Sequence, residues 1–166
     1  ILLAKHRGTM VELRRLLNNG WVGGGEEVRR IQQTGDLVLG AASTAQLMGL
    51  EALMAKDYYA LFAQALPAGW EWSGRQRRPP PDPVNALLSL TSSFMTQRLV
   101  SGCYRYGLEP GVGFLHALGY NRPGLALDLL EPLRCLVCDH FVLKSLRCQK
   151  FKSGDFVQED GSCRLS

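Results

Sequence analysis

In GLALDLLEPLR, which spans Gly124–Arg134, two carboxylates stand three residues apart among leucines at helical spacing. GVGFLHALG (Gly111–Gly119) places a histidine in similarly apolar sequence, and QLMGLEALMAKDYYALFAQ (Gln46–Gln64) places Glu51 within an apolar helical stripe. A folding chain rarely buries carboxylates in such stripes unless a cation or a hydrogen-bond network compensates their charge. These stretches therefore predict a metal site beside an apolar core.

The rest of the chain is expected to be helical too, so the predicted fold class is all-α. In RRPPPDPVNALL (Arg77–Leu88), the triple proline excludes a helix, whereas Asp82 can cap the next one with Pro83 at its first position. The expected helices span residues 2–17, 26–33 (ended by Gly35), 43–66, 83–106 and 125–151, with a kink or two abutting helices at Pro132. Residues 107–124 are expected to be loop with at most a short helical piece over 114–118, and residues 153–166 to be loop.

Composition limits the class of protein. The 166 residues are 46% hydrophobic, enough for one core, and a single domain over 1–166 is expected. No run of about 18 apolar residues occurs, so no membrane-spanning helix is expected. Five cysteines without a regular framework favour a reducing, cytoplasmic setting. Cys135 and Cys138 form a C-x-x-C that lacks a second ligand pair, so we interpret them as core thiols rather than zinc ligands.

Four residues are candidate catalytic groups. Glu51 falls within or beside the buried stripe of its helix, while Asp128 and Glu131 share one helix face because they are spaced i, i+3. Together with the His116 imidazole, these carboxylates suit Mn²⁺ or Mg²⁺ better than zinc. Glu51, His116 and the pair on the last helix each also have an ordinary alternative. Glu51 would pair with a basic side chain of another helix, His116 would be a satisfied core histidine, and Glu131 would pair with Arg134 on the surface.

Two groups of basic residues favour a nucleic acid as partner. One lies along one face of the expected last helix, and the other clusters in the Trp- and Arg-rich loop around residues 70–78. Such cations can follow a sugar–phosphate backbone with salt-dependent affinity. The alternative for the helical group is an ordinary solvated face. The candidate DNA-binding residues are Arg75, Arg77, Arg78, His140, Lys144, Arg147 and Lys150.

At these residues the chain resembles the integrase/endonuclease family of CRISPR spacer acquisition, the Cas-one family. The resemblance covers roughly residues 47–155 and rests on four motifs that occur in the family's order at compatible spacings. They are L-x-G-x-E (Leu47–Glu51) before a Tyr-rich helix, R-R-P-P-x-D-P-x-N-A-L-L-S (Arg77–Ser89), G-L-x-P-x-x-G-F-L-H (Gly107–His116) and L-A-L-D-L-x-E-P-x-R (Leu125–Arg134).

The resemblance implies the C-terminal helical catalytic domain of a metal-dependent DNA endonuclease/integrase. Such an enzyme inserts short foreign DNA, the prespacer, into a CRISPR repeat array by attack of a 3′-hydroxyl on a phosphodiester. Glu51, His116 and Glu131 match the family's three metal-ligand positions, Asp128 matches the neighbouring acid that assists, and the turn at Asp82 is structural. Also implied are Mn²⁺ or Mg²⁺, DNA and the second adaptation protein, Cas-two, as partners, a homodimer formed through an N-terminal β-rich domain, and a prokaryotic cytoplasm.

The chain departs from the family pattern at several positions. Gly124 stands where the family commonly has Ser, and of the family's Lys-x-x-Asn-Gln start only Lys5 is kept, with Gly8 and Thr9 in the other places. The β-rich domain and the helices expected after Phe156 have no counterpart in residues 1–166. We therefore expect a piece of a longer or fused protein, and the activity of this piece by itself is left open.

Two other functions remain open from the residues alone. A non-catalytic nucleic-acid-binding helical module would use the basic residues and leave the acids and the imidazole as ion-paired core. A purely structural all-α interaction domain would use neither group. Titration with Mn²⁺ separates the enzyme from both, because a ligand that binds only the folded protein raises its thermal stability.

Overall fold

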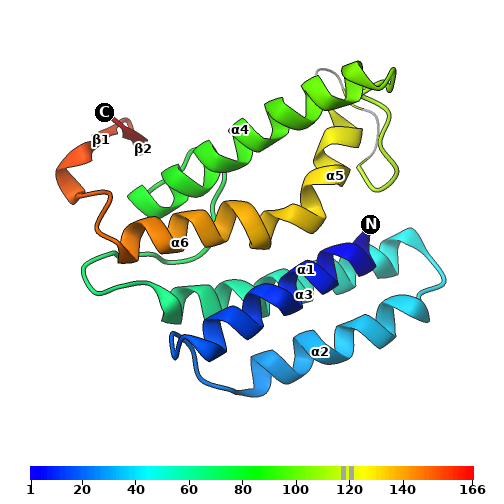
Figure 1. Cartoon of the computed structure of the whole chain (residues 1–166), viewed down its shortest axis with the longest axis horizontal. Helices are drawn as coiled ribbons and strands as arrows, with labels where there is room; N and C mark the ends of the chain where they lie inside the picture. The colour runs from blue at the N-terminus through cyan, green and yellow to red at the C-terminus, as the bar shows by residue number, and fades with distance from the viewer. Residues whose placement is uncertain (117–118, 120–121) are drawn as a thin grey trace.

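The structure, a computed structural model, describes residues 1–116, 119 and 122–166. It is built from helices with a small hairpin at the C-terminal end (Figure 1). This architecture confirms the predicted all-α class. The elements are α1 (Leu2–Asn18), α2 (Glu26–Leu39), α3 (Thr44–Ala65), α4 (Pro83–Arg105), α5 (Gly124–Leu133), the π-helix η1 (Arg134–Asp139), α6 (His140–Arg147), the 3₁₀ turn η2 (Ser153–Asp155), β1 (Phe156–Glu159) and β2 (Ser162–Leu165).

The helices form two groups that meet along α5, η1 and α6. In the first group α1, α2 and α3 pack against one another, with α2 and α3 in the most extensive contact. The α5–η1–α6 segment crosses the α1 side of this group, and α4 packs on the opposite side of that segment together with β2 (Figure 1). One continuous core joins both groups through fully buried side chains, among them Leu13, Phe62, Leu88 and Leu143. This packing places α1 in contact with both α3 and α5 at the candidate site.

Side-chain caps begin the two longest helices where the sequence predicts. The Ser43 hydroxyl accepts a hydrogen bond from the Gln46 amide at the start of α3. The Asp82 carboxylate accepts from the Asn85 amide at 2.7 Å, with Pro83 in the first position of α4. These contacts confirm the predicted starts of both helices.

Two predicted helix ends are wrong. Gly35 does not end α2, which continues to Leu39. A Cβ atom at Gly35 would lie 2.7 Å from Cε1 of His6, so this glycine allows α1 and α2 to approach closely and is not a cap. The last helix ends at Arg147 and not near residue 151. Cys148 caps it, and Gln149 leaves helical geometry with φ of 53°.

The tail was predicted as loop, but it forms an antiparallel hairpin in which Glu159 pairs with Ser162. Asp160 and Gly161 occupy the two turn positions with φ of 49° and 72°. Both values are positive, as a two-residue Asp-Gly hairpin turn requires. The short helical piece expected over 114–118 is absent at residues 114–116, which form bends, and residues 117–118 lie outside the described part. Within the described ranges, no helix is long and apolar enough to cross a membrane.

Candidate metal and nucleic-acid site

Three helices bring one charged side chain each to a common point. Lys5 of α1 is 5% exposed, and its ammonium group forms an ion pair with Glu51 of α3 and another with Glu131 of α5. The Lys5 Nζ atom lies 2.5 Å from Glu131 Oε2 and also contacts Glu51 Oε1. Burial by itself would lower the pKa of Lys5, but the two carboxylates outweigh it and raise that pKa. The ammonium is therefore charged and bridges the two acids.

Glu131 has a second cationic partner on its other oxygen. Nη2 of Arg134 donates to Glu131 Oε1 at 2.8 Å, and both side chains are almost completely buried. Burial alone would raise the pKa of Glu131, but Arg134 and Lys5 together lower it to about 2. The alternative of a surface pair between Glu131 and Arg134 is thus correct in the partner and wrong in the location. The alternative for Glu51, a pair with a basic side chain of another helix, is also realised.

Asp128 has its partners outside this cluster and organises the loop over residues 114–116. Its Oδ2 atom accepts the backbone amides of Phe114 and Leu115 at 2.5 and 2.9 Å. Its Oδ1 atom accepts the His116 amide at 3.1 Å and lies 2.6 Å from Nδ1 of the same residue. Burial would raise the pKa of Asp128, but these hydrogen bonds outweigh burial and lower it. Asp128 and Glu131, although three residues apart, therefore have separate partners.

Glycine makes the close approach of this loop to α5 possible. A Cβ atom at Gly113 would lie 2.7 Å from the carbonyl carbon of Gly124 and 2.9 Å from Asp128 Oδ2. A Cβ atom at Gly124 would lie 2.9 Å from the Gly111 oxygen and 3.0 Å from the His116 oxygen. The family that the sequence resembles commonly has Ser at the position of Gly124. Here the loop lies so close that a side chain at this position would clash with it.

The four candidate catalytic residues therefore form two pairs in this structure. Lys5 joins Glu51 to Glu131, and a hydrogen bond joins His116 to Asp128. Over residues 1–116, 119 and 122–166, no three His, Cys, Asp or Glu side chains are gathered as they would be around a metal ion. The carboxylate pair nevertheless suits a hard divalent cation, because it already encloses a positive charge in a buried place. The three-ligand set stays a prediction.

A groove rich in arginine lies beside Glu131. It has a volume of about 940 Å³ and runs along α4, the start of α5 and the segment that carries Arg77 and Arg78. Arg122, in the loop before α5, and Arg134 also line it. The α4 wall contributes hydroxyl and amide groups from residues including Ser92 and Gln97. No acidic side chain is among its described lining residues. Such a surface is suited to phosphate groups.

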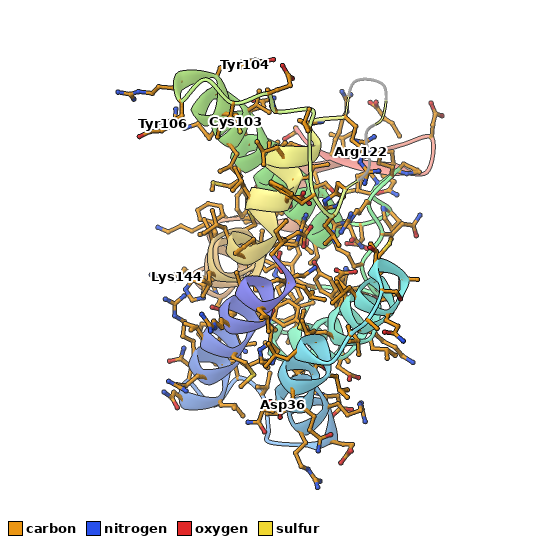
Figure 2. All side chains as sticks on the ribbon, turned by 90° about the vertical axis from the view of Figure 1, so that its right-hand side faces the viewer. Asp36, Cys103, Tyr104, Tyr106, Arg122 and Lys144 are labelled. Atoms are coloured by element: carbon orange, nitrogen blue, oxygen red, sulfur yellow. The ribbon has the colours of Figure 1, made fainter. Side chains whose placement is uncertain are left out.

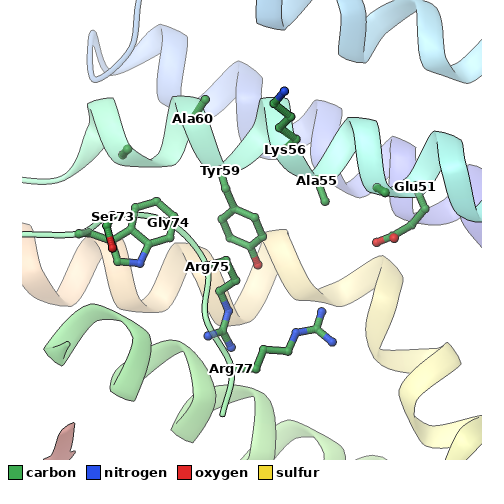
Figure 3. Close-up of a pocket in the computed structure, with 12 residues that line it drawn as sticks. Glu51, Ala55, Lys56, Tyr59, Ala60, Ser73, Gly74, Arg75 and Arg77 are labelled. Atoms are coloured by element: carbon green, nitrogen blue, oxygen red, sulfur yellow. The ribbon is translucent and has the colours of Figure 1, made fainter. Parts of the chain in front are cut away.

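The arginines of the 75–78 loop differ in how much of their charge is available. Arg75 donates to Asn85 Oδ1 at 3.0 Å and to the Ser89 hydroxyl at 3.2 Å, which fixes the loop to α4. Arg77 and Arg78 are exposed. A cavity of about 600 Å³ separates α3 from this loop, and Arg77 and Glu51 both line it (Figure 3). Arg75 and Arg77 therefore share a cavity with Glu51, and of these two Arg77 is the exposed one.

The Asp82–Asn85 turn is structural, as the sequence predicts. The Asn85 side chain accepts from the Gln76 amide at 2.9 Å and donates to the Gly74 oxygen and to Asp82 Oδ2. With its bond from Arg75, this buried amide holds the arginine loop against the start of α4.

Only part of the basic face predicted on the last helix is free to contact DNA. Nδ1 of His140 lies 2.8 Å from the buried carboxylate of Glu12. Arg147 donates to the Ala65 oxygen and lies over the Trp21 ring at 4.3 Å. Lys144 and Lys150 are exposed, but Lys150 lies beyond the end of α6. In Figure 2, Lys144 projects from the side of the molecule opposite Arg122, so this face and the arginine groove point in different directions.

The C-x-x-C thiols are buried, as predicted for core residues. Burial raises the pKa of Cys135 to about 12 and that of Cys138 to about 11, so both are protonated thiols. Neither belongs to a metal-holding group among the described residues.

Sequence reasoning missed two residues that the structure makes prominent. Lys5 entered only as a family match, yet it lies in the same buried stripe of α1 as Leu2, Thr9 and Leu13. A lysine in such a stripe signals a buried anion, and that signal was available. Arg122 was not singled out because it is a lone cation in a loop, and only the fold brings it to the groove.

Comparison with known proteins identifies relatives over nearly the whole chain. The family described as "CRISPR associated protein Cas1" matches residues 3–166. A Cas1 endonuclease of Thermus thermophilus is 36% identical over 164 residues, which covers 99% of this chain and 47% of the relative. A Cas4/Cas1 fusion of Geobacter sulfurreducens is 35% identical over 166 residues, which covers 92% of this chain and 30% of the fusion. The chain thus spans half or less of the length of these relatives.

Solved structures share the fold over the same range. A casposase bound to its integration product superposes with a TM-score of 0.86 at 24% identity, covering 99% of this chain and 49% of the casposase. A Cas1 protein from Thermotoga maritima gives 0.83 at 22% identity and is covered to 53%. A partial Cas6-RT-Cas1–Cas2 complex gives 0.86 at 26% identity and is covered to 50%.

Proposed function

The chain belongs to the Cas1 family of CRISPR-associated proteins, and on that premise we propose that it is the helical catalytic part of a metal-dependent DNA endonuclease and integrase. The reaction would insert short DNA into a CRISPR array by attack of a 3′-hydroxyl on a phosphodiester. One observation carries the proposal. Two carboxylates from separate helices, the partly exposed Glu51 and the buried Glu131, meet around the buried Lys5 ammonium next to an arginine-lined groove.

Glu51 and Glu131 would hold a Mn²⁺ or Mg²⁺ ion, with the His116 imidazole as the third ligand. When bound, such an ion supplies Lewis-acid stabilisation of charge on the phosphate and lowers the pKa of a coordinated hydroxyl. Arg134 keeps Glu131 ionised, since it contributes to lowering the pKa of that carboxyl to about 2. The carboxylate is therefore ready to coordinate at neutral pH without losing a proton.

Asp128 would act through His116. Its carboxylate binds Nδ1 of the ring and the amide of the same residue, which sets the orientation of the side chain. With the Nδ1 proton directed at Asp128, the lone pair of the neutral ring lies on Nε2, the nitrogen that would bind the ion. Asp128 is thus assigned as a positioning residue and not as a ligand.

The arginine groove would receive the DNA backbone. Arg77, Arg78 and Arg122 line it without a carboxylate among the described lining residues, and Arg134 connects it to Glu131. A phosphate in this groove would therefore lie close to the catalytic carboxylates. The Thermus thermophilus relative, which is 36% identical and is named an endonuclease, supports a nucleic acid as the substrate class.

Cas2 is the protein partner that we propose. A structural neighbour at 26% identity comes from a complex described as containing Cas1 and Cas2. We propose in addition a homodimer formed through a segment outside residues 1–166. Sedimentation analysis of the complete protein with and without Cas2 would test both associations.

A non-catalytic nucleic-acid-binding module is the second candidate, and one observation favours it. Lys5 and Arg134 already compensate Glu51 and the buried Glu131, so the charge balance of the fold does not require a metal ion. In that case the arginine groove would bind DNA and Glu131 would be structural.

A comparison of two histidine variants tests the catalytic proposal in the complete protein. His116→Ala should abolish Mn²⁺-dependent strand transfer while the melting temperature and DNA affinity stay close to wild type. His6→Ala is the matched control, because His6 Nε2 lies 2.8 Å from the Ile31 oxygen and has a structural contact only. That control should lower the melting temperature and keep activity in proportion to the folded fraction. If His116→Ala instead behaves like His6→Ala, the catalytic assignment is wrong.

A further inference from the structure

The ammonium group of Lys5 occupies the position between the two carboxylates to which the proposed function assigns a divalent ion. It contacts Glu51 Oε1 and Glu131 Oε2 at the same time, so one charge from α1 bridges acids from α3 and α5. Lys5 is 5% exposed, which makes this an internal contact and not a mobile surface pair. Without that charge, two carboxylates at this place would repel each other and lose hydration.

The oxygen atoms of Glu131 are already engaged with cations on both sides. Oε1 accepts from Arg134 at 2.8 Å and Oε2 lies 2.5 Å from Lys5 Nζ. Arg134 can keep its contact while Oε2 changes partner, because the two oxygens point to different groups. An ion that bridges Glu51 and Glu131 must therefore replace the ammonium at Oε2, since two cations at such short range repel strongly in a buried place.

Little free space lies beside the ammonium on the side of Glu51. The cleft lined by Lys5, Glu51 and Arg134 has a volume of about 20 Å³. That is room for roughly one water-sized occupant.

We propose that Lys5 is a built-in competitor for the metal position, which holds Glu51 and Glu131 together in the metal-free protein and must be displaced when a divalent ion binds. This inference depends on the proposed function, because it assumes that these carboxylates are ligands. Its consequence is a site that is preassembled and stable without metal, and whose apparent metal affinity is reduced by the free energy of removing the ammonium. Lys5 is thus a positioning residue. It lowers the affinity of the site for a metal ion, whereas a ligand raises it.

Removing the ammonium charge should change metal affinity and metal-free stability in opposite directions. In the complete protein, Lys5→Met keeps an unbranched side chain of similar length without the charge. We expect a lower melting temperature in EDTA and a Mn²⁺ dissociation constant, measured by calorimetry, that is about 5- to 150-fold tighter than wild type, the range of ordinary coupling between two ligands. Lys5→Gln, which retains a hydrogen-bond donor, should show the same gain in affinity and serves if the Met variant folds poorly.

Lys56→Met is the matched control. Lys56 is exposed on α3 and lines the same cavity as Glu51, so its removal changes the local charge equally without emptying the bridging position. We expect this control to bind Mn²⁺ like the wild type. A gain of affinity in the control equal to that in Lys5→Met would overturn the proposal, because it would reflect net charge alone.

A measurement on the wild type needs no substitution. Reductive methylation of Lys5, followed by mass spectrometry, should be slow in EDTA and faster with Mn²⁺, because the displaced ammonium leaves its buried pair. Methylation that stays equally slow with saturating Mn²⁺ would show that the ammonium is not displaced.

The outcomes separate this inference from the proposed function. If Glu131→Gln abolishes Mn²⁺ binding but the Lys5 variants bind equally or more weakly than wild type, Lys5 is no competitor and the metal site stands. If neither the wild type nor any variant binds Mn²⁺, the metal site and the competitor both fail.

Discussion

Nδ1 of His116 lies 2.6 Å from Oδ1 of Asp128, and the same oxygen accepts the His116 backbone amide at 3.1 Å. One carboxylate thus fixes both the backbone and the ring of the histidine. The other oxygen of Asp128 fixes the two preceding residues of the loop. The position of the imidazole is therefore determined by α5 and not by the loop itself.

The first prediction concerns this carboxylate. Asp128→Asn replaces an oxygen that accepts backbone amides with a group that donates, so some of these amides lose their acceptor. We expect a loss of about 1–3 kcal/mol in unfolding free energy and about 10- to 100-fold weaker Mn²⁺ binding, as for other residues that orient a metal ligand. Calorimetry and thermal denaturation of the complete protein measure both. Wild-type metal affinity in this variant would show that Asp128 does not position a ligand.

The second prediction tests the contact between the loop and α5. In Gly113→Ala the new methyl group would lie 2.7 Å from the Gly124 carbonyl carbon and 2.8 Å from the His116 oxygen, so the loop must move. We expect a lower melting temperature and loss of strand transfer in the same variant. Gly102→Ala is the control, because a Cβ atom there, in the last turn of α4, meets nothing within 4 Å. The control should gain about 0.5–1 kcal/mol of stability from helix propensity.

The third prediction concerns the buried carboxyl of Asp139 at the end of η1. It is 1% exposed, and within the described part of the chain its Oδ2 atom has no hydrogen-bond partner. Burial raises the pKa of Asp139 to about 6, despite the opposing effect of Arg134 and Arg75. Because the folded-state pKa is above the ordinary value, the folded protein keeps this proton as pH rises from about 4 to about 6, while the unfolded chain releases it.

The free energy of unfolding should therefore fall as pH rises across that range. At pH 7, where Asp139 is ionised in both states, the whole destabilisation due to its burial should be present. Asp139→Asn does not titrate, so we expect it to equal the wild type near pH 3.5 and to be more stable by about 3 kcal/mol at pH 7. Urea denaturation at several pH values measures the difference. A difference that does not change with pH would mean that Asp139 has an ordinary pKa.

The fourth prediction separates the two basic surfaces. Arg78→Ala and Arg122→Ala remove exposed cations from the groove. Each should reduce the slope of log affinity against log salt by about 0.9 for duplex DNA, the value for one lost phosphate contact. Lys144→Ala removes a cation from the other side of the molecule (Figure 2). We expect this variant to keep the wild-type slope. A reduced slope for Lys144→Ala would place DNA on the α6 face as well.

Local signals in the sequence predicted most of the helices. Ser43, Asp82 and Pro83 begin α3 and α4 where capping rules place them, and Asn18 ends α1 one residue from the expected position. The helix end that was predicted wrongly at Gly35 depends on a contact between helices. Gly35 does not end α2 because it lies against His6 of another helix, a contact that no local pattern reveals. The Asp160–Gly161 turn was a local signal for the hairpin, but its strands are too short to show alternation.

The sequence predicted candidate residues for the site but not how the fold pairs them. Helical spacing placed Asp128 and Glu131 on one face, yet the fold gives each a different partner. Spacing within one helix cannot identify these partners, because Lys5 and His116 come from distant parts of the chain. The Lys5 bridge depends on how three helices cross, which is a property of packing and not of any one segment.

The central claim is that Glu51, His116 and Glu131 hold one divalent ion. Diffraction from crystals of the complete protein soaked in Mn²⁺, with data collected at the manganese absorption edge, tests it most directly. We predict one anomalous peak within about 2.0–2.3 Å of a carboxylate oxygen of Glu51, of Glu131 and of a His116 ring nitrogen, with the Lys5 ammonium withdrawn from both acids. A peak elsewhere, or no peak while Lys5 still bridges Glu51 and Glu131, would contradict the claim.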